Sequence, residues 1–304
     1  MLTLLTAPPG LARWRRTTTA LLALSLLVAV VALRETLLSA WYGNLGYLGL
    51  SRGLLSGGDE GLLSARASFI QALARQGWNP SASWGLGRVY YHLGDDDAAV
   101  EAWQGSERAL SRLLSSSDSA FKGQDYPLAL ELALLAQRLE PQSSSVRYRL
   151  GEAYQVTGEL DRALEEYERA KEYNAFLPGD ERDLASCYFG QARVYEAQSN
   201  WEAARWHYEA GLQIGEDAAA YASLGRIYHY QVGDLDTAEA LLKQAIALEP
   251  GEAWWRISLG ELYLAGARYE EALFELEQAV ALDPDNEEAR QGLEQALEQL
   301  HPGT

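Results

Sequence analysis

A short phrase that recurs at a regular spacing constrains the fold of this chain more than any other feature. Its clearest copy is Leu150-Gly151-x-x-Tyr154, then Gly158, then Ala163, Tyr167 and Ala170. The three- and four-residue spacings place each half on one face of a helix, and Gly158 marks a tight turn between them. A glycine inside a helix costs about 1 kcal/mol relative to alanine, so Gly151 indicates close contact with a neighbouring helix. The phrase therefore predicts two antiparallel helices that meet at small residues.

The phrase returns several times with a period of about 34 residues, which is typical of a solenoid and not of a generic helical bundle. Further copies begin with Leu86-Gly87-x-x-Tyr90, Leu224-Gly225-x-x-Tyr228 and Leu259-Gly260-x-x-Tyr263. A weaker copy contains Ala192-x-x-Tyr195, and the copy that begins at Leu224 carries one extra residue in its turn.

These copies resemble the tetratricopeptide repeat family, whose pattern is Leu-Gly-x-x-Tyr, then Ala and an aromatic residue, then a closing proline. The resemblance covers about residues 81–284. It implies an all-α, right-handed superhelical solenoid of helix pairs. In this family the first helices line a concave groove, which holds extended segments or C-termini of partner proteins.

An apolar stretch near the N-terminus predicts a single transmembrane helix. Residues 17–33 carry no charge, and Arg13, Arg15 and Arg16 precede them. Because basic residues stay on the cytoplasmic side, we expect residues 1–16 in the cytoplasm, a signal-anchor helix over 17–38 and the repeats outside. A cleaved signal peptide is the alternative, but the long apolar run without a polar spacer favours an uncleaved anchor.

The remaining segments flank the repeats. Residues 39–80 are expected to hold a linker and a degenerate first helix pair, in which Gly49, Gly53, Gly57 and Gly61 recur every four residues. Such glycines would form a close seam in a membrane helix, but the polar residues among them favour a loosened first helix of a repeat. Residues 285–304 are charged and predict the polar capping helix that a solenoid needs to end in water.

Composition and motifs argue against several functions. The formal charge of −18 disfavours binding to nucleic acid through phosphates. The four histidines and the single Cys187 form no His-x-x-x-His or Cys-x-x-Cys spacing, so no metal site is expected. The acidic run Asp95–Asp97 falls at a predicted turn, where it would cap a helix. We expect no catalytic residues, no cofactor and no enzymatic activity.

The groove implied by the resemblance selects one stripe of each first helix. The stripe lies two residues before the Leu of the phrase, just after its Gly and just after its Tyr. The predicted partner-binding residues, with their aromatic or histidine neighbours, are Trp84, Arg88, Tyr91, His92, Tyr148, Glu152, Gln155, Phe189, Arg193, Glu196, Arg226, His229, Tyr230, Trp254 and Glu261. Packing between neighbouring first helices is an equally good explanation for the aromatic residues among them.

The sequence therefore predicts a membrane-tethered scaffold that holds partner proteins in its groove. Arginines beside aromatic rings also suit acidic sugars, so an accessory role in envelope polysaccharide assembly or export is the alternative. A third hypothesis is the regulatory tail of a polytopic enzyme, made as a separate chain. The sequence decides neither the partner nor the oligomeric state.

Overall fold

The computed structural model describes residues 9–176 and 181–301, with side chains at 24–174 and 184–301. Every regular element in these residues is a helix, so the predicted all-α class is confirmed. Residues 1–8 of the predicted basic N-terminus and the last three of the predicted capping segment lie outside the described residues. The chain divides into two compact units, residues 1–115 and 116–304.

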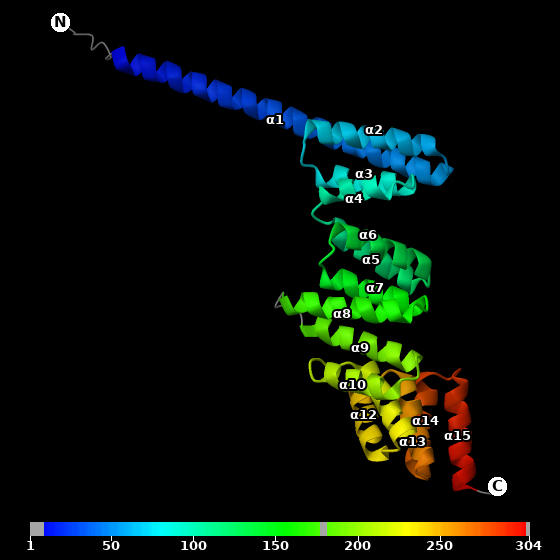
Figure 1. Cartoon of the computed structure of the whole chain (residues 1–304). Coiled ribbons are helices and arrows are strands. Elements are labelled where there is room, and N and C mark those ends of the chain that lie inside the picture. The colour runs from blue at the N-terminus through cyan, green and yellow to red at the C-terminus, as the bar shows by residue number, and fades with distance from the viewer. Residues whose placement is uncertain (1–8, 177–180, 302–304) are drawn as a thin grey trace. The chain divides into compact units, whose positions relative to one another are not determined.

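In the first unit, α1 (Pro9–Ser56) is one unbroken helix whose C-terminal part packs against α2 (Asp59–Arg75) (Figure 1). α3 (Pro80–His92) and α4 (Asp96–Gln104) form the next pair, and α5 (Ala109–Lys122) begins in this unit. The stretch Leu24–Ser56 of α1 is long and apolar enough to cross a membrane, by length and composition.

The contact between α1 and α2 is made by glycines. A Cβ on Gly61 would lie 2.5 Å from the backbone nitrogen of Gly53, so the two helices touch backbone to backbone. Gly57 has φ of 65° and makes the left-handed turn between them. The regular glycines therefore join the two helices of one pair within a single chain.

The second unit continues the series of helix pairs. Its elements are the end of α5, α6 (Tyr126–Leu139), α7 (Ser144–Val156), α8 (Leu160–Phe176), α9 (Glu181–Ala197), α10 (Trp201–Leu212), α11 (Ala218–Ile227), η1 (Tyr228–Val232), α12 (Leu235–Leu248), α13 (Ala253–Ala265), α14 (Tyr269–Leu282) and α15 (Glu287–Leu300). Each odd-numbered helix from α7 to α13 packs against the helix that follows it.

Short polar side chains start many of these helices. Asp95 accepts a hydrogen bond from the backbone nitrogen of Ala98 at 3.1 Å and caps α4, which confirms the capping role predicted for the acidic run. Asp125, Asn200 and Asp217 cap α6, α10 and α11 in the same way. The turn residues of the repeat thus supply partners for the free N–H groups at the helix starts.

Large side chains of the second helices fill the space that the glycines of the first helices leave open. Tyr167 in α8 is fully buried and lies between two glycines. A Cβ on Gly151 of α7 would lie 2.7 Å from its ring, and one on Gly190 of α9 would lie 2.4 Å away. Since real Cβ atoms do not approach this closely, the glycines set how near the neighbouring first helices come to Tyr167.

The extra residue in the copy that begins at Leu224 is accommodated within a helix. α11 ends at Ile227 and continues directly as the π-helical segment η1, and Gly233 then turns the chain with φ of 79°. A π-helical turn is the usual way to insert one residue without breaking a helix, and it often occurs at functional sites.

A buried ion pair occurs at equivalent places in two repeats. Arg147 in α7 and Glu166 in α8 are 2.8 Å apart, with side chains 10% and 9% exposed. Arg256 in α13 and Glu275 in α14 form the same pair at 2.7 Å. Arg147 also donates two hydrogen bonds to the carbonyl oxygen of Pro141, so its charge is well compensated inside the unit.

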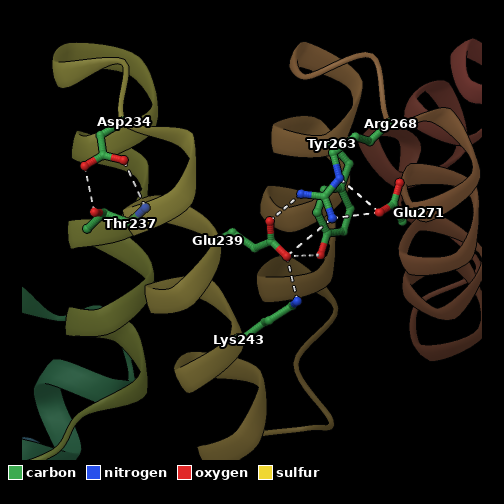
Figure 2. A network of polar contacts seen from close by, with 7 residues as sticks. All are labelled: Asp234, Thr237, Glu239, Lys243, Tyr263, Arg268 and Glu271. Carbon is green, nitrogen blue, oxygen red and sulfur yellow. Dashed lines mark hydrogen bonds and ion pairs between the residues drawn. The ribbon is translucent and has the colours of Figure 1, made fainter.

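A second polar network joins adjacent repeats near the C-terminus (Figure 2). The carboxylate of Glu239 in α12 accepts hydrogen bonds from Arg268, from Lys243 at 2.6 Å and from the Tyr263 hydroxyl at 3.0 Å. Arg268 also contacts Glu271 at 2.7 Å and lies 4.3 Å from the Tyr263 ring centroid. The hydrogen bond from Arg268 is the main reason that the pKa of Glu239 falls from 4.5 to about 2.

This shift predicts a loss of stability in acid. A carboxyl group whose pKa is lowered by folding stabilises the fold above its unfolded pKa, and this contribution disappears as the pH falls through the folded pKa. Glu239→Gln should therefore lower the free energy of unfolding at neutral pH, and the gap to the wild type should close between pH 4.5 and about 2. Denaturant unfolding across this pH range measures the gap, with the exposed Asp236→Asn on the same helix as the control. A gap that stays constant with pH would contradict the prediction.

Candidate functional site

The groove residues predicted in the first unit form an aromatic cluster on α3. Trp84 stacks on Trp103 with ring centroids 5.5 Å apart, and Tyr91 lies 6.5 Å from Trp103. His92 lies 5.2 Å from Tyr91, and burial followed by the charge of Arg88 lowers the pKa of His92. Burial and the positive charge of Arg88 therefore both oppose protonation of His92.

One arginine of this cluster was missing from the predicted set. The guanidinium carbon of Arg112, in α5, lies 5.0 Å from the Trp84 ring centroid, close enough for a cation–π contact. Burial raises the pKa of Tyr47 in α1, and the positive charge of Arg112 offsets part of this rise. Arg112 belongs to a degenerate copy of the phrase, so the repeat pattern gave no signal for it.

The predicted partner-binding residues of the second unit are here named the wall: Tyr148, Glu152, Gln155, Phe189, Arg193, Glu196, Arg226, His229, Tyr230, Trp254 and Glu261. Arg193 is the most enclosed arginine among them. It extends from α9, and the side chains whose charges act on it are Tyr167, Tyr148, Tyr208 and Glu152. Burial alone would lower the pKa of Arg193, but these neighbours outweigh burial and raise it. The guanidinium therefore keeps its positive charge at any physiological pH.

The polar residues of this wall accept hydrogen bonds from tyrosine hydroxyls. Tyr148 donates to Glu152 at 2.9 Å, Tyr167 to Gln155 at 3.1 Å and Tyr208 to Glu196 at 2.7 Å. Tyr167 and Tyr208 come from the second helices, which the predicted stripe of the first helices does not include. Their rings fill the core while their hydroxyls fix the wall, a double role that Tyr allows because it is apolar with one polar end.

The aromatic end of the wall lies on the π-helical segment η1. The rings of His229 and Tyr230 stack with centroids 4.1 Å apart, and the Tyr230 hydroxyl donates to Glu261 of α13 at 2.8 Å. Tyr230 is nevertheless 55% exposed. Arg226 is exposed, and its positive charge offsets part of the rise in pKa that burial causes at Tyr230 and at Glu288. Burial lowers the pKa of His229, and the guanidinium of Arg226 places a positive charge at this end.

Two predicted residues lie apart from these clusters. Phe189 is only 5% exposed and packs in the core of α9, α10 and α11, so it offers little surface to a partner. The reason is Gly211 of α10, where a Cβ would lie 2.4 Å from the Phe189 ring. The equivalent positions in α8, α12 and α14 hold alanine (Ala170, Ala245 and Ala279), and here the glycine leaves room for the ring. Trp254, at the start of α13, is half exposed.

Comparison with known proteins identifies the repeats. Three family models, each described as tetratricopeptide repeat, match residues 48–109, 142–217 and 229–297. Together these matches cover more than half of the chain. The chain belongs to the tetratricopeptide repeat family. Its fold is that of a scaffold for protein–protein interaction, and the predicted family is confirmed.

Two curated relatives of this tetratricopeptide repeat protein come from bacteria. One is "Cellulose synthase operon protein C" of Xanthomonas axonopodis pv. citri, 25% identical over 79% of this chain and 17% of the relative. The other is "Lipopolysaccharide assembly protein B" of Escherichia coli K12, 27% identical over 44% of this chain and 34% of the relative. The matches thus span about a sixth and a third of these relatives. A solved tetratricopeptide repeat protein of Thermus thermophilus is 26% identical, with a TM-score of 0.46 over 62% of this chain and 98% of that one.

Proposed function

We propose that this tetratricopeptide repeat protein is a membrane-anchored, non-enzymatic scaffold that holds an extended segment of a partner protein along its first helices. In this proposal α1 crosses the membrane, with the N-terminus in the cytoplasm and the repeats on the other side. The apolar stretch of α1 and the arginines before it support the anchor and its orientation.

The observation that carries the proposal is the aromatic end of the wall. An exposed aromatic side chain normally loses rotamer freedom when a partner covers it, which costs binding free energy. Tyr230 avoids much of this cost because Glu261 and His229 already hold it in place. A fixed, exposed tyrosine beside the arginine Arg226 has the composition typical of residues that dominate protein interfaces.

The test is the double variant Arg226→Glu and Tyr230→Ala in the full-length chain. Both side chains are exposed, so the fold should survive, which circular dichroism can verify. Affinity purification of the double variant from the native membrane should recover at least about tenfold less partner protein than purification of the wild type. A loss of this size is the effect of removing one interface hot spot. Phe274→Ala removes an exposed aromatic residue of α14 outside the predicted wall and is the matched control. Equal recovery with both variants would count against the wall as the binding surface.

A second candidate function is an accessory role in envelope polysaccharide or lipopolysaccharide assembly. The names of the two bacterial relatives support it, and the arginines of the wall would suit an acidic saccharide. The same double variant separates the two candidates. Loss of a protein partner supports the scaffold, whereas loss of bound glycan with the protein partners retained supports the accessory role.

A further inference from the structure

The surface of α1 that faces away from α2 has a regular apolar pattern. Gly46, Gly49 and Gly53 of α1 face Phe69, Ala65 and Leu62 of α2. Each residue turns a helix by about 100°, so Trp41, Leu48 and Leu55 lie on average about 130° from the line of these glycines, named here the glycine seam. The helix thus has a free side along its whole packed length.

Six apolar residues follow this free side and are here named the α1 stripe. They are Leu27, Val30, Leu37, Trp41, Leu48 and Leu55, and each is at least 54% exposed. Trp41, Leu48 and Leu55 are seven residues apart, and Leu27 lies two such steps before Trp41. The remaining positions of the same seven-residue spacing hold polar residues, namely Arg34, Asn44 and Ser51. Of these, Arg34 is the one charged residue.

A bilayer can cover only part of the α1 stripe. A helix rises 1.5 Å per residue, so Leu27 and Leu55 are about 42 Å apart along the axis, against a hydrocarbon core of about 30 Å. When Leu27 lies in lipid, Leu55 lies outside the core. Leu55 is 89% exposed in the single chain, and covering its side chain with another apolar surface removes it from water. We therefore expect a protein partner to cover the part of the α1 stripe that lies outside the bilayer.

The spacing identifies the kind of partner. Apolar residues that repeat every seven positions, with a second set three or four positions away, form the seam of a left-handed coiled coil. The partner must be a long helix with the same spacing, and a second α1 has it. Two copies in one membrane share one orientation, which makes a parallel pair. A polar residue such as Asn44 among apolar positions fixes the register of such pairs.

We infer that the α1 stripe pairs with the α1 stripe of a second copy of this chain and forms a parallel homodimer. This interface uses the opposite side of α1 from the glycine seam and none of the wall residues. It is therefore independent of the partner binding proposed above, except that the shared orientation rests on the proposed membrane anchor. The dimer presents two sets of repeats from one pair of anchors, which raises the effective concentration of a second binding event.

Cysteine cross-linking in the native membrane tests the inference on the full-length chain. Cys187 is the only cysteine, and Cys187→Ala gives a background without thiols. In this background Leu48→Cys and Leu55→Cys place thiols in the α1 stripe. Leu54→Cys is the control, because position 54 points about 100° away from position 55 around the helix. Mild oxidation should give about tenfold more covalent dimer at positions 48 and 55 than at 54, because a disulfide needs Cα atoms within about 7 Å.

The inference is overturned when positions 48 and 55 give no covalent dimer, or when all three positions give equal yields. A second measurement compares the wild-type chain, called the parent, with the double variant Leu48→Lys and Leu55→Lys in mild detergent. Light scattering should show a dimeric parent and a monomeric variant, with equal helix content by circular dichroism. A monomeric parent or a dimeric variant would also overturn it.

Discussion

Tyr167→Ala should lower the free energy of unfolding by about 3–5 kcal/mol, the range for removing a large aromatic side chain from a packed core. Tyr167 is fully buried, and the glycines on either side of it leave no side chain that could move into the space. The variant also loses the hydrogen bond that the Tyr167 hydroxyl donates to Gln155. Guanidinium unfolding followed by circular dichroism measures the change.

Two further variants divide this loss into its causes. Tyr167→Phe keeps the ring and removes the hydroxyl, so it should cost about 1 kcal/mol, the net value of a typical hydrogen bond. Phe274→Ala removes an exposed ring and should stay within about 0.5 kcal/mol of the wild type. A loss at Tyr167→Ala no larger than at Phe274→Ala would show that the glycine pocket does not hold the repeats together.

Arg147→Met should destabilise the second unit by about 3–5 kcal/mol, because it leaves the carboxylate of Glu166 buried without its main partner. The remaining contact from Arg169 to Glu166, at 3.3 Å, keeps the loss toward the lower end of this range. The equivalent Arg256→Met, which separates Glu275 from its partner, should behave in the same way. Urea unfolding of the two variants measures both losses.

A double substitution shows whether the charges themselves are needed. Replacing Arg147 by Met and Glu166 by Leu together should recover most of the lost stability, since apolar residues of similar size often substitute for a buried ion pair. Arg162→Met is the control, because the ion pair that Arg162 forms with Glu159 has side chains 63% and 40% exposed. Such a pair is worth about 1 kcal/mol or less. A double variant as unstable as Arg147→Met would mean that the pair is required for packing geometry.

The sequence predicted the helix pairs well because their pattern is local. Leu150, Gly151 and Tyr154 mark one helix face within a few residues, and capping residues such as Asp95 mark the start of the next helix. The length of α1 was harder to foresee. Gly43, Gly46, Gly49 and Gly53 all disfavour a long helix by propensity, and packing against α2 overrides this preference.

The candidate site was only partly predictable for a related reason. The stripe rule places Tyr148, Glu152 and Arg193 together because it depends on spacing within first helices. The hydroxyl groups of Tyr167 and Tyr208 come from second helices, whose residues the rule assigns to the core. Phe189 turned inward because of Gly211, a residue in another helix that a rule for single helices does not include.

The unbroken helix α1 has a mechanical consequence. A helix with no hinge transmits rotation and tilt along its axis, and the glycine seam joins α2 rigidly to its far end. When α1 crosses a bilayer, a change in the tilt of its membrane part swings the first helix pair through the same angle. With about 1.5 Å of rise per residue, the 48 residues of α1 make a lever about 72 Å long. Lipid thickness or a neighbouring membrane helix would then change the direction in which the first repeats point.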